Sequence, residues 1–207
     1  MRLILVRHGE TDSNKASLAL GRDDVELNET GRWQAQRLAE VLQCQPIVAV
    51  YSSPLRRTLA TAQAIAERHH LPMEMDEGLI EMEIGEMEGL TFQQVRERYP
   101  QFLQLWLGGR AAYEPMPGGE RLVDVQERAW QALERICAAW SQETVAVVTH
   151  NFVLLTILCR VLGLELADFR RLRHNVAAVS MLQVQEGRMT VLGLNDTCHL
   201  EAASARD

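Results

Sequence analysis

Three short apolar runs, each followed by polar residues, are the strongest feature of the hydrophobic pattern. They cover residues 3–6, 47–50 and 145–148, are rich in β-branched side chains and carry no charge. Apolar runs of this length are typical of strands that are buried on both faces of a parallel sheet. Two further stretches, residues 178–184 and 189–194, are separated by a short Glu-Gly segment, and this spacing predicts a hairpin.

The segments between these strands show helical periodicity, with apolar residues at spacings of three and four. The pattern runs through residues 35–42, 55–66, 122–140 and 152–162. We expect the first helix to begin at Asn28 or Thr30 and the second at Pro54, with shorter helices at residues 91–98 and about 102–107. Strands that alternate with helices predict an α/β fold, a three-layer sandwich with a mostly parallel central sheet flanked by helices.

The length of 207 residues suits a single domain spanning residues 1–207. The middle of the chain is less regular, because glutamates surround Gly85 and glycine pairs interrupt residues 108–119. We therefore expect a helical cap region, inserted into the domain at about residues 80–120. The sequence leaves open whether the glycine-rich part of this region is ordered without a substrate.

Composition and charge narrow the choice of partners. The formal net charge is -7, so we expect no nucleic acid partner and no attraction to an anionic membrane. No apolar stretch reaches the roughly 18 residues of a membrane span, and no signal peptide is recognisable. The four cysteines fit no zinc pattern. These features predict a cytoplasmic protein without a metal or cofactor, and leave the oligomeric state open, with a homodimer as one option.

Charged and polar residues follow three of the predicted strands. Arg7 and His8 follow the first strand, His150 follows the strand at residues 145–148, and Arg57 lies in the helix after Ser53. The carboxyl ends of parallel strands meet at one edge of a sheet, where ligands bind in open α/β folds. Each residue alone has an ordinary structural explanation, as a buried histidine or a surface arginine. Together they predict an electropositive cup, formed by Arg7, His8, Arg57 and His150, that suits a phosphate dianion.

A series of motifs, in this order along the chain, resembles the signatures of the histidine phosphatase superfamily, in its phosphoglycerate mutase-like branch. They are residues 5–11 (LVRHGET) with Asn14, residues 52–58 (SSPLRRT), residues 79–81 (LIE) with Gly85, Glu88 and Gly89, residues 117–120 (PGGE) and residues 147–150 (VVTH). The resemblance covers nearly the whole chain. It implies a phosphoglycerate mutase-like fold and a metal-independent phosphatase that acts on a small phosphorylated metabolite.

The resemblance implies that His8 attacks phosphorus and forms a phosphohistidine, which divides one difficult displacement into two easier steps. His8 must be neutral at the attacking nitrogen, and we expect a backbone carbonyl near Gly9 to hold the proton of the other nitrogen. Gly9 is expected to allow a sharp turn of the chain after the first strand.

The other members of the predicted catalytic set supply charge and protons. Arg7, Arg57 and a protonated His150 are expected to surround the phosphate oxygens in place of a metal ion. Glu81, the first glutamate of the third motif, would protonate the leaving oxygen and then accept a proton from the attacking water. That role requires a raised carboxyl pKa, which burial or the nearby dianion would give.

Substrate binding is predicted at Asn14, Gly21, Arg22, Asn151 and His199. Asn14 adds a neutral donor, and Arg22 and His199 are candidate partners of a substrate carboxylate. Asp24 or Glu83 would face an ammonium group. The acids Glu83, Glu86 and Glu88 have a simpler explanation as solvated or structural residues.

The choice of substrate depends on features outside the shared motifs. The chain lacks the basic insertion of the mutases, which favours hydrolysis, and its residues 194–200 are similar to the tail of metal-independent phosphoserine phosphatases. Those enzymes carry a histidine just after the catalytic glutamate, where this chain has Ile84. Phosphoserine is the predicted substrate, with α-ribazole phosphatase and broad-specificity phosphatase as alternatives. The compact chain without the basic insertion disfavours a mutase. A binding module without catalysis is disfavoured because both histidines, both arginines and Glu81 are present.

Overall fold

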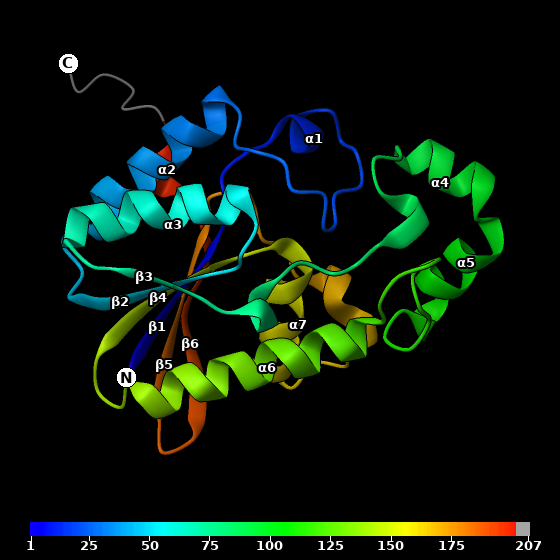
Figure 1. The fold of residues 1–207 in the computed structure, drawn as a ribbon. Coiled ribbons are helices and arrows are strands. Elements are labelled where there is room, and N and C mark those ends of the chain that lie inside the picture. The colour runs from blue at the N-terminus through cyan, green and yellow to red at the C-terminus, as the bar shows by residue number, and fades with distance from the viewer. Residues whose placement is uncertain (202–207) are drawn as a thin grey trace.

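The computed structural model describes residues 1–201, and these form a six-stranded sheet of order β3-β2-β4-β1-β5-β6 (Figure 1). The strands are β1 (Arg2–Arg7), β2 (Ile47–Ser52), β3 (Met73–Met75), β4 (Thr144–Thr149), β5 (Val179–Gln185) and β6 (Arg188–Asp196). The neighbours β3, β2, β4 and β1 are parallel, whereas β5 and β6 are antiparallel. The predicted strands, the hairpin and the mostly parallel sheet are confirmed, and β3 is an addition that is too short and exposed to give a hydrophobic pattern.

The helices lie largely where the periodicity predicts them. The α-helices are α1 (Asp12–Lys15), α2 (Glu29–Leu42), α3 (Arg56–His69), α4 (Phe92–Arg98), α5 (Pro100–Leu105), α6 (Leu122–Ala139) and α7 (Asn151–Leu162). Short helical turns follow at η1 (Glu77–Leu79), η2 (Gly85–Met87), η3 (Trp106–Arg110), η4 (Leu166–Arg171) and η5 (Cys198–Leu200). None of the helices within residues 1–201 is long and apolar enough to cross a membrane.

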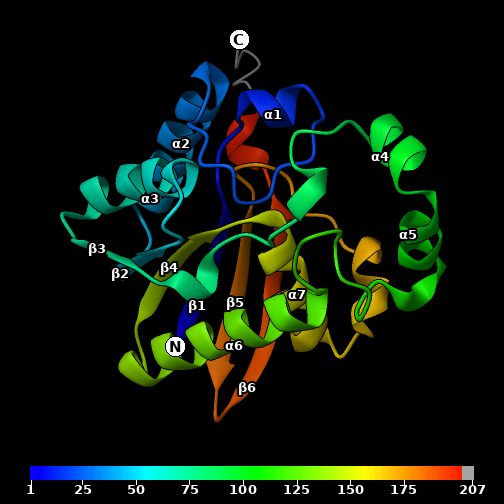
Figure 2. The same cartoon turned by 45° about the vertical axis from the view of Figure 1, so that its right-hand side comes forward.

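Three layers result from the alternation of side chains along the central strands. Leu3 and Leu5 of β1 pack in the core cluster that includes residues of α6 and α7, whereas Ile4 and Val6 pack with residues of α2 and α3. Figures 1 and 2 show these two helix pairs on opposite faces of the sheet. The predicted three-layer sandwich is therefore confirmed, and β1 is buried on both faces.

Helix starts show which local signals determine the structure. Asn28 caps α2, because its side chain accepts a hydrogen bond from the Gly31 N–H at 2.8 Å, so Thr30 is not the cap. The expectation that Pro54 opens the next helix is wrong, since α3 begins at Arg56 after an extended Leu55. The first helical N–H of α3 donates instead to the Asp24 carboxylate of a distant loop, at 2.7 Å. A cap that is supplied from 32 residues away leaves no local sequence signal.

Helices α4 and α5 lie beside the sheet layers rather than on them (Figures 1 and 2). The ring of Trp106, which follows α5, stacks on Phe102 and makes edge contacts with Phe152 of α7 and Phe169 of η4. These aromatic contacts attach the segment to the α7 side of the domain. The assignment of residues 80–120 as a functional cap stays a prediction.

Candidate active site

The two histidines of the electropositive cup are brought together by adjacent strands. Strands β1 and β4 pair in parallel, with Arg7 opposite Thr149, so the residues that follow them meet at one sheet edge. The imidazole centroids of His8 and His150 are 5.2 Å apart, and both side chains are buried. The His8 N–H donates to the Thr149 carbonyl at 3.1 Å, which extends the pairing one residue beyond the strand.

His8 is held as a neutral ring with one defined tautomer. Its Nδ1 lies 2.7 Å from the Gly9 carbonyl oxygen, so Nδ1 donates its proton there and Nε2 keeps a lone pair. Burial, with the guanidinium groups of Arg57 and Arg7, holds the pKa of His8 well below its usual range. The structure therefore supplies the backbone acceptor near Gly9 that the sequence predicts, and it presents Nε2 as a nucleophile.

Gly9 is required for close packing rather than for a turn. Its φ is not positive, but a Cβ atom at this position would lie 2.5 Å from the Gly31 carbonyl oxygen of α2. The Gly9 N–H also donates to Thr61 Oγ1 of α3 at 3.1 Å. The expectation that a sharp turn needs glycine here is wrong, because φ of Gly9 is one that other residues adopt. Glycine is needed instead because the contact between this loop and α2 leaves no room for a side chain.

Arg57 is completely buried, and its positive charge acts on both His8 and His150. Its Nη2 donates to the Gly21 carbonyl at 2.6 Å and its Nη1 donates to the Asp23 carbonyl at 2.7 Å. Its Nε has no hydrogen-bond partner among residues 1–201. A buried guanidinium that is held by neutral carbonyls keeps its positive charge available for an anion.

Arg7 is held in a similar way, by oxygen acceptors that carry no charge. Its Nη1 donates to the Asn151 Oδ1 at 3.1 Å and to the His174 carbonyl at 2.7 Å. Desolvation lowers the pKa of Arg7 to about 10, and the group stays charged at neutral pH. Asn151, predicted to bind substrate, thus contacts Arg7 directly.

His150 contacts the hydroxyl group of Ser53, which directly follows β2. Its Nε2 lies 2.7 Å from Ser53 Oγ, and its buried Nδ1 has no partner in the described part of the chain. Burial and the positive charge of Arg57 lower the pKa of His150 well below its usual range, so the ring is neutral here. The protonated ring that is expected around a bound phosphate stays a prediction. A phosphate dianion would favour protonation, because it reverses the sign of the local charge.

Ser53 is a site residue that the sequence argument did not assign. The signal for it is its position at the carboxyl end of β2, next to β4 in the sheet. Residues at this edge are brought close to His150 by the strand order alone.

Glu81 completes the site with a buried carboxyl group. Its Oε1 accepts from the Met82 N–H at 2.8 Å, and its Oε2 accepts from the Phe152 N–H of α7 at 3.3 Å. Burial raises the pKa of Glu81 and outweighs the opposing hydrogen bonds and arginines. The raised pKa agrees with the role of proton donor.

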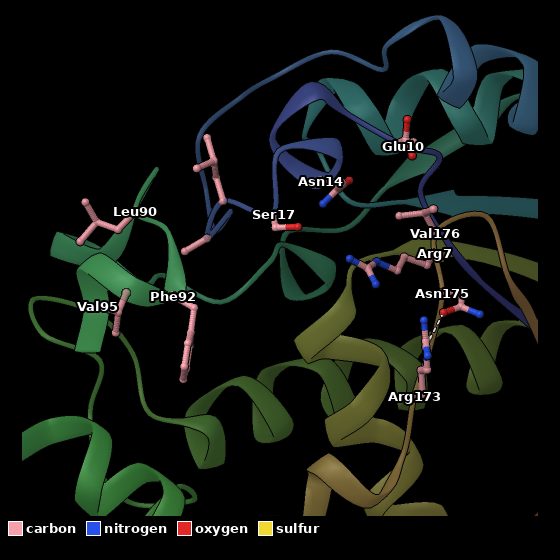
Figure 3. A pocket seen from close by; sticks show the side chains of 12 residues that line it. Arg7, Glu10, Asn14, Ser17, Leu90, Phe92, Val95, Arg173, Asn175 and Val176 are labelled. Atoms are coloured by element: carbon pink, nitrogen blue, oxygen red, sulfur yellow. Dashed lines mark hydrogen bonds between the residues drawn. The ribbon is translucent and has the colours of Figure 1, made fainter. Parts of the chain in front are cut away.

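A cavity of about 610 Å³ opens in front of Arg7 (Figure 3). One wall is apolar and includes Leu90, Phe92 and Val95, while Arg173 and Asn175 lie on the side of Arg7. The remaining lining residues are Glu10, Asn14, Ser17, Leu18, Ala19 and Val176. The cavity thus joins a cationic inner end to an apolar outer wall.

Asn14 is the predicted substrate-binding residue that lines this cavity. Its Oδ1 accepts from the Thr11 N–H and hydroxyl in a capping box that begins the four-residue helix α1. Residues 12–15 form this helix without an apolar face, since none of them is buried. Because the amide oxygen is engaged by Thr11, the amide nitrogen is the group that Asn14 can offer to a phosphate.

The other predicted substrate-binding residues have mostly structural contacts. Gly21 holds Arg57, and its N–H donates to Glu88 at 2.7 Å. Arg22 lies 3.1 Å from Glu120 and 3.5 Å from Glu83, so its charge is already paired. His199 belongs to η5, which packs against α2, and it is not among the side chains that line the cavity.

The acidic residues near the site have contacts within the protein. Asp24 caps α3, and Glu83 pairs with Arg22, while the role of either carboxylate toward a substrate ammonium group stays a prediction. Glu86 accepts from the Tyr99 hydroxyl at 2.8 Å and Glu88 accepts from backbone N–H groups, which agrees with their structural interpretation. Ile84 is buried in the core.

Arg173 and Asn175 are cavity residues that the sequence argument missed. They directly precede β5, which runs antiparallel to β1. The start of such a strand lies at the same sheet edge as the end of its parallel neighbours, so the predicted hairpin already contained a signal for them. Within residues 1–201, no group of three or more His, Cys, Asp or Glu side chains is arranged to hold a metal ion.

Comparison with known proteins agrees with this geometry. The family model described as "Histidine phosphatase superfamily (branch 1)" matches residues 3–197. Phosphoserine phosphatase 1 of Hydrogenobacter thermophilus is 35% identical over 200 residues, which cover 97% of this chain and 94% of that protein. The metal-independent phosphoserine phosphatase of Arabidopsis thaliana is 32% identical over 202 residues, covering 97% of this chain and 83% of that protein.

A solved structure gives the same result for the fold. A mutant of the phosphoserine phosphatase from Entamoeba histolytica, in complex with phosphoserine, superposes with a TM-score of 0.87 at 27% identity. The match covers 96% of this chain and 98% of that chain. The assignment to a phosphatase family and the fold class predicted from the motifs are therefore confirmed.

Proposed function

The chain belongs to branch 1 of the histidine phosphatase superfamily, and on this premise we propose that it is a metal-independent phosphatase that hydrolyses phosphoserine through a phosphohistidine. The observation that carries this proposal is the His8 ring, which is neutral, has its Nδ1 bonded to Gly9 and lies in a buried cup with Arg7 and Arg57. A neutral nucleophile beside two fixed cations suits attack on a phosphate dianion.

In the first step, the phosphate oxygens are bound by Arg7, Arg57 and His150, and Nε2 of His8 attacks phosphorus. The P–N bond forms while the bond from phosphorus to the leaving oxygen breaks. Glu81 gives its proton to that oxygen, so the substrate alcohol leaves neutral. The raised pKa of Glu81 supports this step, because the carboxyl group must be protonated beforehand.

In the second step, a water molecule attacks phosphorus from the side that the alcohol has left. Glu81, now ionised, accepts a proton from this water, and the P–N bond breaks. Inorganic phosphate leaves and His8 returns to its neutral form. One carboxyl group therefore serves as acid and then as base, and both steps use the same cationic stabilisation.

Phosphoserine as the substrate is supported by the relatives and by free polar groups in the cavity. The guanidinium of Arg173 donates to Asn175 Oδ1 at 2.7 Å and belongs to an exposed residue that lines the cavity. It is better placed than Arg22 to bind a substrate carboxylate, since Arg22 is paired with Glu83 and Glu120. A role for His199 as a carboxylate partner from the tail stays a prediction.

A second candidate is a larger phosphorylated metabolite such as α-ribazole phosphate, and the cavity supports it. Its volume of about 610 Å³ and its wall of Leu90, Phe92 and Val95 suit a leaving group with apolar surface. Phosphoserine offers no such surface. A broad-specificity phosphatase is the form of this alternative in which no single leaving group is preferred.

The test is a comparison of kcat/KM for phosphoserine, 3-phosphoglycerate, α-ribazole phosphate and p-nitrophenyl phosphate, with release of inorganic phosphate as the measurement. We expect phosphoserine to be the best of the three metabolites, because sites that bind polar groups strongly reject analogues lacking them. A preference for α-ribazole phosphate would overturn the substrate assignment. No phosphate release from any of the four would overturn the phosphatase proposal.

Metal independence has its own test. The positive charge in the cup comes from Arg7 and Arg57, and His150 adds to it when phosphate favours its protonation, so we expect kcat/KM for p-nitrophenyl phosphate to be unchanged after dialysis against EDTA. The control is the same preparation dialysed without chelator. Loss of activity that magnesium restores would contradict the proposal. The cytoplasmic location and the homodimer stay predictions.

A further inference from the structure

The PGGE motif at residues 117–120 has no role in the mechanism described above, yet it is packed tightly behind Glu81. The Glu120 N–H donates to the Glu83 carbonyl at 2.8 Å, and the Glu83 N–H donates to Glu120 Oε2 at 2.8 Å. A Cβ atom on Gly119 would lie 2.2 Å from the Glu83 carbonyl oxygen. Glycine at this position therefore permits the close approach that places the Glu120 carboxylate beside residues 81–83.

The Glu120 carboxylate is shared by two arginines from different parts of the chain. Arg22 comes from the loop before α2, and its Nη2 lies 3.1 Å from Glu120 Oε1. Arg128 comes from α6, and its Nε and Nη2 each lie 3.1 Å from a Glu120 oxygen. These three side chains form one charged network, and each of them is at least two-thirds buried.

Both arginines of this network bond to the same backbone carbonyl, that of Glu81. Arg22 Nε donates to the Glu81 oxygen at 3.1 Å, and Arg128 Nη2 donates to it at 3.0 Å. Arg128 Nη1 also donates to the carbonyls of Gly78, at 3.0 Å, and Ile80, at 2.5 Å. One guanidinium thus bonds three carbonyls of the irregular segment that ends in the proton donor.

A segment without regular secondary structure needs such bonds to hold a catalytic side chain in place. Glu81 follows the single turn η1 and precedes η2, so no helix or strand fixes its backbone. Its carboxylate is bonded to two N–H groups, and its carbonyl is bonded to the two arginines. Glu81 is therefore held both at its carboxyl group and at its backbone.

From these contacts we propose that Arg128, Glu120 and Arg22 are positioning residues that hold Glu81 in the orientation needed for proton transfer to the leaving oxygen. The inference rests on the proposed phosphatase function. It assigns Arg22 to the catalytic glutamate rather than to a substrate carboxylate, and it gives the PGGE motif a role in the reaction. A small displacement of a catalytic group is enough to lower a rate substantially.

The role can be separated from a general structural role by the basicity of the leaving group. Phenyl phosphate releases a more basic phenolate than p-nitrophenyl phosphate does, so its departure depends more on proton donation. We expect Arg128→Gln to lower kcat/KM for phenyl phosphate about tenfold more than for p-nitrophenyl phosphate. The two esters are nearly equal in shape and charge, so a change in phosphate binding would affect them alike.

Arg135→Gln is the matched control on the same helix. Arg135 bonds to both carboxylate oxygens of Asp76, at 2.8 and 2.9 Å, and so anchors η1 without contacting Glu81. We expect Arg135→Gln to change kcat/KM for the two esters by the same factor. Two results would overturn the proposal. One is an equal loss of kcat/KM on both esters with Arg128→Gln, and the other is a selective loss on phenyl phosphate with Arg135→Gln.

Arg22→Gln is a second variant for the same test if Arg128→Gln does not fold. It removes one bond to the Glu81 carbonyl from a side chain that is 33% exposed, and we expect a smaller selective loss on phenyl phosphate. Equal losses on the two esters with this variant would also overturn the proposal. If the unaltered protein hydrolyses neither ester, the proposed function fails instead.

Discussion

The residues of the cup show what a sequence reveals about a site and what it leaves open. The residue types and their positions after strands were enough to predict Arg7, His8, Arg57 and His150. The neutral state of His150 and its Ser53 partner were not predictable, because they depend on burial and on the nearby positive charge of Arg57. Protonation follows from the environment that the fold creates.

His8→Ala is expected to abolish phosphate release, with a loss of at least about a thousandfold in kcat for p-nitrophenyl phosphate. The reason is that no other side chain in the cup combines a free ring nitrogen with a fixed tautomer. The thermal midpoint should stay close to that of the unaltered protein, which calorimetry checks. Substantial residual turnover, or continued labelling of the variant by substrate phosphate, would contradict the assignment of the nucleophile.

Buried histidines should also make the protein sensitive to acid. Burial lowers the pKa of His174 to about 4 and lowers the pKa values of His8 and His150 well below their usual range. In the unfolded chain these rings titrate near a pKa of about 6.5. Between these values the unfolded state binds more protons, so the free energy of unfolding falls as pH falls below about 6.5.

The size of this effect follows from linkage, at up to about 1.4 kcal/mol per histidine for each pH unit. Glu81 opposes it, because its raised pKa stabilises the folded state in acid and this contribution is lost as pH rises. Because three histidines lower the free energy of unfolding in acid and one glutamate raises it, we expect a net fall. Urea unfolding at pH 5.5 and 6.5 measures the slope, and His174→Gln should reduce it. A stability that is constant or higher at pH 5.5 would contradict the prediction.

At the scale of elements, the strands and long helices were predictable because each carries its own hydrophobic pattern. The short elements were not. Strand β3 has three residues with little burial, and α1 is formed by a capping box of Thr11 and Asn14 rather than by an apolar face. The loop at residues 21–24 is equally invisible to periodicity, although it holds Arg57 through the Gly21 and Asp23 carbonyls.

Gly21→Ala should therefore impair the site through its loop. A Cβ atom on Gly21 would lie 2.7 Å from Ile84 Cγ1 and 2.8 Å from the Met82 carbonyl oxygen. The loop must shift, which moves the carbonyl that holds Arg57. We expect KM for p-nitrophenyl phosphate to rise about tenfold, and the free energy of unfolding to fall by about 1–3 kcal/mol.

Gly193→Ala is the control for this substitution. A Cβ atom on Gly193 of β6 would meet no heavy atom within 4 Å among residues 1–201, and its φ is not positive. Its steady-state kinetics should match those of the unaltered protein. If both alanine variants behave alike, the loop does not position Arg57.

At the scale of the whole molecule, the site depends on parts of the chain that are far apart in sequence. The cup combines residues at the end of β1, within α3 and after β4, and the sequence predicted this because parallel strands end at one edge. The cavity in front of it was not predicted as a whole. Its walls come from residues 90–95 and 173–176, whose mutual placement depends on tertiary packing rather than on any local pattern.

Because the cup draws on distant elements, an anion bound there should stabilise the entire domain. Binding to the folded state alone adds about 2.7 kcal/mol to the free energy of unfolding at a ligand concentration of about 100 times Kd. We expect potassium phosphate to raise the thermal midpoint relative to potassium chloride at equal ionic strength. Equal midpoints in the two salts would show that the cup does not bind phosphate.

The separation between the apolar wall and the cup has a consequence for evolutionary divergence. Arg57 and both histidines are fully or almost fully buried, whereas Phe92 of the wall is 63% exposed and lies on a helix beside the sheet layers. Substitutions at Phe92 thus cost little folding free energy and leave the reacting groups in place, whereas mutations in the cup damage both at once. A lineage with this architecture can adopt a new phosphorylated metabolite through a few changes near Phe92 while its hydrolytic step is inherited unchanged.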